Sequence, residues 1–261
     1  MDIERPPLSA ADLERALVRP GGLWREVMVV SETGSTNTDL LQAASAGAAE
    51  GTVLAADAQT AGRGRMGRRW LSPPRAALIF SVLLRPAGVT PSSWGWVPLL
   101  AGVSAVSALR RVAAVEAVLK WPNDVLVAHR KLAGILAEQA GEAVVTGMGI
   151  NVSAVPPGEV GAAATCLESE GSAISRAELL VAVLGEFEAR YRGWVSDPGG
   201  SGLRQEFQSV CDTLGRTVHV TLPGGRMIAG TALDVDGYGQ LVLRTEGTIS
   251  AVSAGDVVHV R

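Results

Sequence analysis

The pattern of apolar and polar residues divides the chain into two parts. Up to about residue 210, short apolar runs alternate with longer segments whose apolar residues recur at the three- and four-residue spacing of helices. Beyond residue 211, short segments of alternating apolar and polar residues follow one another, separated by "PGG", "DGYG" and "EG". This change predicts an α+β fold with two domains, 1–210 and 211–261, of which the second is a small β-barrel.

The first part contains both strand-like and helix-like segments. Continuous apolar runs bounded by turn residues predict strands, and N-cap residues followed by apolar residues at helical spacing predict helices. Strands are predicted at 27–32, 53–57, 77–84, 117–120 and 143–153, with a hairpin at 125–139; helices are predicted after 35–37, at 97–113 and at 175–195. Strands in the second part are predicted at 216–222, 226–236, 239–245 and 248–260.

Composition narrows the class of protein. The chain is 47% hydrophobic, which is enough for a substantial core, and its net charge of −3 argues against a general nucleic-acid or membrane-surface binder. Its two cysteines, Cys166 and Cys211, form no CxxC pair, so zinc is not expected. The N-terminus has acidic residues and no signal-type apolar run, and no apolar stretch reaches transmembrane length. We predict a cytoplasmic protein with no membrane contact.

Although the chain as a whole is slightly acidic, residues 60–70 are strongly basic. They read "TAGRGRMGRRW", with three glycines and four arginines. We call this segment the glycine–arginine loop. Glycines let backbone amides approach a ligand closely, and arginines donate to phosphate or carboxylate groups. The segment lacks the GK[ST] ending of a Walker A loop, and arginines fill positions where a dinucleotide-binding turn prefers small residues. Taken alone, it favours phosphate binding and RNA binding equally.

Two further segments carry charged side chains at strand ends. "KWPND" (120–124) ends a predicted strand with a cation, an amide and a carboxylate, a set that suits a metal–phosphate ligand, although an ordinary turn is slightly favoured for this motif alone. In "RKLAGIL" (130–136), Lys131 either points at an anionic substrate or is a surface lysine at a hairpin tip.

A fourth segment, "GSTN" (34–37), lies at the start of a predicted helix. Helix N-termini attract anions and offer free amides, so these side chains either contact a polar ligand or only cap the helix. No GxSxG or HExxH motif occurs, and the three histidines are scattered. Hydrolytic triads and zinc chemistry are therefore poorly supported.

Together with "GMGINV" (147–152), these segments, in this order, resemble the biotin protein ligases. The resemblance implies a class II synthetase-like catalytic domain, with a mixed sheet flanked by helices, followed by a small SH3-like domain. Lipoate protein ligases share the catalytic fold but are not expected to carry the GRGRxGR segment.

The resemblance implies an ATP-dependent, AMP-forming ligase that uses Mg²⁺. Biotin and ATP would give biotinyl-5′-adenylate, and biotin would then pass to a lysine of the biotin carboxyl carrier domains of acyl-CoA and pyruvate carboxylases. "GSTN" begins at residue 34, which leaves too little chain for an N-terminal DNA-binding domain, so we expect no repressor function and no DNA binding. A monomer or weak homodimer is expected. The alternatives are a lipoate or octanoyl ligase of the same fold and, in a different class, an RNA-binding module.

The resemblance also implies roles for individual residues. The catalytic residues would be Lys131, Arg65 and Asp124, with Asp124 orienting or deprotonating the incoming lysine. The biotin contacts would be Ser35, Thr36, Asn37, Gln59, Arg63, Gly64, Arg65, Lys131 and Gly134. The nucleotide contacts would be Arg65, Arg68, Trp70, Asn123 and Asn151, and Asn123 would also face Mg²⁺ through the phosphates. The glycine–arginine loop would close over biotin and the adenylate.

Overall fold

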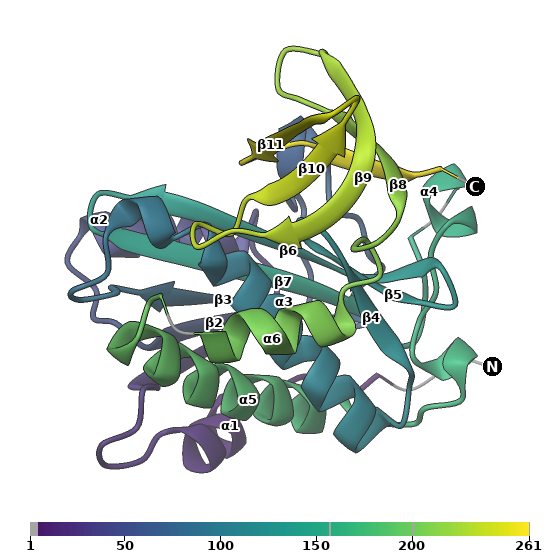
Figure 1. The fold of residues 1–261 in the computed structure, drawn as a ribbon. Helices are drawn as coiled ribbons and strands as arrows, with labels where there is room; N and C mark the ends of the chain where they lie inside the picture. The colour runs from purple at the N-terminus through teal and green to yellow at the C-terminus, as the bar shows by residue number, and fades with distance from the viewer. Residues whose placement is uncertain (1–4, 157, 200, 261) are drawn as a thin grey trace.

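A seven-stranded mixed sheet forms the centre of the molecule (Figure 1). The structure is a computed structural model that describes residues 5–156, 158–199 and 201–260. Only the first two strands of the sheet run parallel, and every other neighbouring pair is antiparallel. The strands lie in the order β1 (Glu26–Val30), β2 (Thr52–Ala56), β3 (Ala77–Leu84), β7 (Ala143–Asn151), β6 (Arg130–Ala140), β5 (Asp124–Val127) and β4 (Ala117–Lys120).

Helices cover the two faces of this sheet unequally (Figure 1). On one face, α2 (Thr36–Ser45) packs Leu40 against Leu54, Leu83 and Val145. On the other face lie α1 (Ala10–Leu17), α3 (Trp96–Ala108) and α5 (Arg176–Ser196), which enclose the larger core. Strand β3 is buried along its whole length because its alternate side chains enter these two cores. The predicted mixed sheet flanked by helices is confirmed.

Helix α3 is apolar around its whole circumference because it lies inside the larger core. The helical stretch Pro91–Ala113, which includes α3, is long and apolar enough to span a membrane, with a mean hydropathy of 1.2. The sequence analysis predicted that no apolar stretch reaches transmembrane length. By length and composition this one does, so that prediction was wrong. Within this stretch, 67% of the most apolar window is buried inside the protein, as expected for a core helix.

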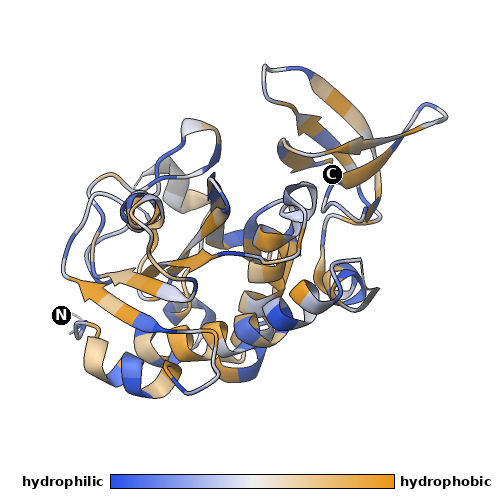
Figure 2. Cartoon of the chain, turned by 90° about the vertical axis from the view of Figure 1, so that its left-hand side faces the viewer, coloured by the Kyte–Doolittle hydropathy of each residue, from blue (hydrophilic) through white to orange (hydrophobic). Residues whose placement is uncertain are grey.

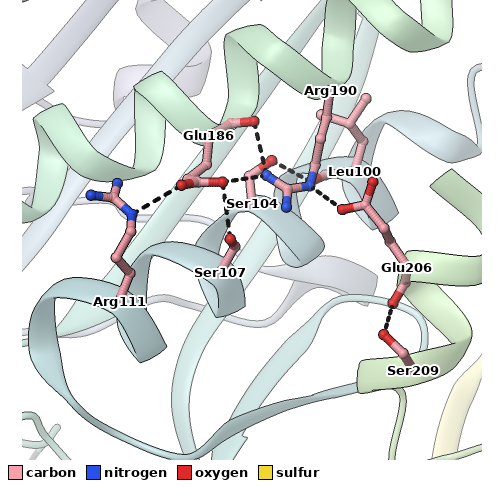
Figure 3. A network of polar contacts seen from close by, with 8 residues as sticks. All are labelled: Leu100, Ser104, Ser107, Arg111, Glu186, Arg190, Glu206 and Ser209. Carbon is pink, nitrogen blue, oxygen red and sulfur yellow. Dashed lines mark hydrogen bonds and ion pairs between the residues drawn. The ribbon is translucent and has the colours of Figure 1, made fainter. Parts of the chain in front are cut away.

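Polar contacts also join α3 to α5 and α6 (Ser201–Val210) (Figure 3). Glu186 on α5 accepts from Ser107 and Arg111 and pairs with Arg190, whose guanidinium also reaches Glu206 on α6. Helix α5 begins with a capping box between Ser175 and Glu178, as its predicted N-cap requires.

The chain beyond residue 216 forms a separate five-stranded antiparallel sheet, which stands apart from the rest of the molecule in Figure 2. Its order is β11 (Thr248–Val252), β10 (Leu241–Thr245), β9 (Met227–Val235), β8 (Thr217–Thr221) and β12 (Asp256–His259). The predicted strand at 248–260 is in fact two strands. The turn between them brings Gly255 so close to β8 that a Cβ there would lie 2.6 Å from Val220.

The sequence analysis missed three helices, α1, α4 (Glu159–Ala162) and α6. Helix α4 has only four residues and contains Gly161, so it carries no periodic signal, whereas α1 and α6 do place apolar residues at helical spacing and could have been found. The domain boundary at 210/211 stays a prediction.

The second sheet is attached beside the end of β4. The Trp121 indole donates to the Gly239 carbonyl at 3.2 Å, and the Trp121 amide donates to the Thr213 hydroxyl at 3.0 Å. Because Trp121 belongs to "KWPND", this attachment places the second sheet next to one of the motifs of interest.

Candidate functional site

One cavity of about 520 Å³ brings the sequence motifs together. It lies on the face of the central sheet that α2 covers, beside the N-terminus of that helix. All fourteen predicted site residues line it: Ser35, Thr36, Asn37, Gln59, Arg63, Gly64, Arg65, Arg68, Trp70, Asn123, Asp124, Lys131, Gly134 and Asn151. Their individual roles stay predictions, but their convergence from separate segments is a property of the fold.

One end of the cavity, which we call the polar end, is formed by Ser35, Thr36 and Asn37. Ser35 is the N-cap of α2, and all three residues are buried. The Gln59 side-chain oxygen accepts from the Thr36 amide at 2.8 Å and from the Thr36 hydroxyl at 3.1 Å. These contacts hold the residue before the glycine–arginine loop against the start of α2.

Ser81 completes the polar end, and the sequence analysis missed it. Its hydroxyl contacts the Thr36 hydroxyl at 2.7 Å and the Asn37 side-chain oxygen at 2.6 Å. A signal was present, since Ser81 is the one polar residue in the apolar run "ALIFSVLL" and a buried hydroxyl requires a partner. Gly147 on β7 is also required at the polar end, because a Cβ there would lie 2.1 Å from the Asn37 side-chain oxygen.

The floor of the cavity is made by glycines beneath the Trp70 ring. A Cβ at Gly149 would lie 2.4 Å from Trp70 Cε2, and one at Gly134 would lie 3.3 Å from Trp70 Cζ3. Gly134 and Gly149 are paired across β6 and β7. The absence of side chains at these positions is therefore what lets the indole lie on the sheet.

The other end of the cavity, which we call the basic end, is formed by Lys131, Arg65 and Arg68. Lys131 Nζ lies 2.5 Å from Asp124 Oδ1. Lys131 on β6 and Asp124 on β5 lie on neighbouring strands of the predicted hairpin, so the hairpin itself brings "KWPND" and "RKLAGIL" together.

The side-chain amide of Asn123 uses its nitrogen within the protein and has its oxygen available. Its side-chain nitrogen donates to the Ile135 carbonyl at 3.0 Å, and this bond leaves the side-chain oxygen as a ligand for a cation. Within the described residues there is no cluster of three His, Cys, Asp or Glu side chains that could hold a metal. In nucleotide sites, Mg²⁺ is held by one or two protein oxygens together with the phosphates. Asn123 and Asp124 fit Mg²⁺ in that way and not as a complete protein site.

The glycine–arginine loop crosses the basic end and reaches the second sheet. Arg68 pairs with Asp256 at 2.7 Å, and the Arg65 guanidinium donates to the Gly255 carbonyl at 3.4 Å. Burial lowers the pKa of the Arg65 guanidinium, and the nearby Asp256 carboxylate opposes that shift. The C-terminal sheet is thus part of the wall that holds these two arginines, a contact that the sequence did not predict.

The longer segment 57–75, which contains the glycine–arginine loop, has both of its ends in one ion-pair cluster. Asp57, which follows β2, pairs with Arg75 at 3.1 Å and with the buried Arg176 of α5 at 2.8 Å. The Arg75 amide also donates to the Asp57 carbonyl at 2.7 Å. These contacts hold the two ends of the segment together at one point.

Two buried polar atoms at the cavity have no partner among the described residues. They are the Trp70 Nε1 donor and the Asn151 Oδ1 acceptor. Asn151 uses its nitrogen to donate to the Thr165 carbonyl at 3.0 Å. A buried unpaired polar atom costs about 1–3 kcal/mol, so these atoms favour a ligand that supplies both a donor and an acceptor.

Comparisons with known proteins agree with this geometry. Residues 29–154 match the model of the biotin/lipoate A/B protein ligase family, and residues 213–260 match that of the biotin protein ligase C terminal domain. The chain is 44% identical to the biotin–[acetyl-CoA-carboxylase] ligase of Mycobacterium tuberculosis, covering 98% of this chain and 97% of that protein. It is 34% identical to the bifunctional ligase/repressor BirA of Bacillus subtilis, over 90% of this chain and 76% of that protein. Among solved structures, the biotin protein ligase from Aquifex aeolicus in complex with biotin and ATP superposes with a TM-score of 0.77 at 30% identity, covering 91% of this chain and 100% of that one.

Proposed function

The chain belongs to the biotin protein ligase family, and we propose that its cavity forms biotinyl-5′-adenylate from biotin and ATP and then transfers biotin to a carrier-domain lysine. One observation carries the proposal: the fourteen motif residues line a single cavity with a buried polar end and a basic end. Biotin has the same asymmetry, since it joins an uncharged polar ring system to a carboxylate.

In the first step, a biotin carboxylate oxygen attacks the α-phosphorus of ATP. The bond from that phosphorus to the bridging oxygen breaks, and pyrophosphate leaves. The reactants are both anionic, so the cavity must neutralise the charge that develops between them. Lys131, Arg65 and Arg68 provide that neutralisation, with the polar end holding the biotin ring system. Bound Mg²⁺ would add charge neutralisation at the phosphates, with Asn123 and Asp124 as its oxygen ligands.

In the second step, the ε-amine of a carrier lysine attacks the acyl carbon, and AMP leaves. The amine must lose a proton as the amide forms. Asp124 is the carboxylate at the basic end that is placed to accept it, once Lys131 turns from Asp124 toward the anionic ligand. The glycine–arginine loop, anchored at both ends, would keep water from the reactive anhydride between the two steps.

The test is pyrophosphate release by the purified protein with biotin and ATP, followed by labelling of a carrier domain. Failure of both reactions would rule out the proposal. Lipoate in competition with biotin separates the alternative of a lipoate or octanoyl ligase, against which the matched C-terminal domain and the relatives already count.

The RNA-binding alternative is less favoured by the geometry. It requires arginines without partners in the protein, whereas Arg63 pairs with Glu138 and Arg68 pairs with Asp256, although both arginine side chains are about half exposed. If RNA affinity is salt-sensitive and survives Lys131→Ala, the alternative regains support.

The names of the M. tuberculosis and Paracoccus denitrificans relatives support the carrier domain of acetyl-CoA carboxylase as the acceptor. Pyruvate carboxylase as a second acceptor, a monomer or weak homodimer, a cytoplasmic location and the lack of repressor function remain our predictions. Carrier labelling with each domain and sedimentation with and without biotin and ATP would test the first two.

A further inference from the structure

Glu138, near the end of β6, lies behind the cavity rather than in its lining and has no role in the chemistry above. It is two residues beyond Leu136 and four beyond Gly134, so its side chain leaves the sheet on the same face as the cavity. An acidic side chain on that face, beside a segment rich in arginine, requires an explanation.

The two carboxylate oxygens of Glu138 hold two different segments. Oε2 accepts a hydrogen bond from the Asn37 side-chain nitrogen at 3.0 Å, and Oε1 pairs with Arg63 Nη2 at 2.9 Å. One carboxylate therefore joins the polar end of the cavity to the start of the glycine–arginine loop.

The Asn37 side of this bridge is rigid. The same Asn37 nitrogen donates to the Leu136 carbonyl at 3.0 Å, and the Asn37 oxygen accepts from Ser81 at 2.6 Å. The Asn37 oxygen also fills the space left by the missing side chain of Gly147, and these contacts orient the Asn37 amide, so Glu138 is held by a fixed donor. Arg63 is by contrast half exposed, so its position depends on its partner.

From this geometry we infer that Glu138 is a positioning residue that closes the glycine–arginine loop against the polar end of the cavity. Glu138 acts on the loop through Arg63 and on the polar end through Asn37. An occupied polar end and a closed loop therefore stabilise each other. The effect on biotin and adenylate retention rests on the proposed function. The effect on the loop itself does not.

The test compares Glu138→Gln with Glu142→Gln, a matched control. Glu142 is exposed in the turn that joins β6 to β7, so its substitution makes the same change of charge in the same hairpin. Glutamine at 138 keeps an oxygen for Asn37 but loses the ion pair with Arg63. A partly exposed ion pair of this kind predicts an effect of about two- to fivefold.

Hydrogen exchange of the segment 60–70, measured without any ligand, is the first readout. We expect Glu138→Gln to speed exchange there two- to fivefold, with β6 and β7 unchanged, and we expect Glu142→Gln to match the wild type. Arg63→Gln should have the same effect as Glu138→Gln, and the double variant should add nothing to it. Wild-type exchange in Glu138→Gln, additive effects in the double variant, or faster exchange throughout the sheet would overturn the inference.

The rate at which a preformed adenylate dissociates is the second readout. We expect Glu138→Gln to raise this rate by a similar factor with a smaller change in the KM for ATP. An unchanged dissociation rate would contradict the coupling to the ligand. If the wild type forms no adenylate, the proposed function fails, whereas the exchange measurement still decides the role of Glu138 in the loop.

Discussion

The two ends of the cavity are built in opposite ways. At the polar end, Ser35, Thr36 and Asn37 are at most 4% exposed. Gln59 accepts hydrogen bonds from Thr36, and the Ser81 hydroxyl contacts the side chains of Thr36 and Asn37. At the basic end, the side chains of Lys131 and Arg68 are 35% and 56% exposed, and each pairs with a carboxylate at the start of a strand, Asp124 of β5 and Asp256 of β12. Buried hydrogen bonds define one geometry, whereas half-exposed ion pairs can exchange partners at small cost.

This difference matches the tasks that we propose for the two ends. A polar end that does not move can select one ring system by the positions of its donors and acceptors. A basic end must first hold its cations without a ligand and then release them to phosphates. Each cation there has a partner within the protein that a phosphate could replace. These partners are Asp124 for Lys131, Asp256 for Arg68 and the Gly255 carbonyl for Arg65.

The largest expected effect is at the basic end, with Lys131→Ala. We expect adenylate formation to fall by about 100-fold or more, because a cation aimed at the developing charge is lost. The fold should persist, since Lys131 is only partly buried and its loss frees Asp124 toward solvent. Pyrophosphate release measures the first effect and the melting temperature the second. Turnover like that of the wild type would remove Lys131 from the chemistry.

At the polar end, Gly147→Ala tests whether its geometry is as fixed as we describe. The added methyl group would lie 2.1 Å from the Asn37 oxygen, so Asn37 must move or the strands must separate. Overpacking of this kind costs about 1–3 kcal/mol, and we expect most of it to appear as weaker biotin binding. The increase in melting temperature with biotin is the measurement. Gly193→Ala, at an exposed site on α5 where a Cβ has free space, is the control, and equal responses would refute the rigid model.

An effect of similar size is expected for Arg65→Ala. Removing a charged donor to the adenylate costs about 1.5–3 kcal/mol, so the adenylate should dissociate about tenfold faster or more. Biotin binding without ATP should change less, because the polar end is intact. A chase of bound adenylate with unlabelled ligand measures the rate, and an unchanged rate would contradict a loop that closes over the adenylate.

The smallest effect concerns His259 of β12, which lies where the second sheet is attached, next to the Thr213 hydroxyl that accepts from the Trp121 amide. Its ring lies 3.2 Å from the Thr213 hydroxyl, and Asp212, Lys120, Arg216 and His129 are the charged or titratable groups that act on it. Burial lowers the pKa of His259 below its ordinary value of 6.5, with Lys120 adding to the shift and Asp212 opposing it.

A lowered histidine pKa means that the unfolded chain binds the proton more readily than the folded one. The free energy of unfolding should therefore fall as the pH drops below about 6.5 toward the folded-state pKa. Urea unfolding at several pH values, for the wild type and His259→Gln, isolates this contribution. The variant should lose less stability on acidification, and parallel curves for the two proteins would contradict the assignment.

Much of the fold could be predicted because single segments carried their own signals. The run 77–84 is β3 to the residue, and Ser175 caps α5 as its sequence implies. The helices at 10–17 and 201–210 were missed although apolar residues recur at helical spacing in both, as at Leu13 and Leu17 and at Leu203 and Phe207. The division of 248–260 was missed although Ser253 and Gly255 are turn residues within it, and Gly255 lies too close to β8 to carry a side chain.

The sequence by itself determined which motifs carry cations, amides and hydroxyls, and in which order these motifs follow one another along the chain. Only the tertiary structure decided their partners. Ser81 and Glu138 belong to strands that read as ordinary sheet, and Asp256 belongs to the second sheet, whereas the arginine that it holds lies in the glycine–arginine loop. The physical reason is that hydrogen bonds and ion pairs depend on distances of about 3 Å, which the register of strands far apart in sequence sets and no local pattern records.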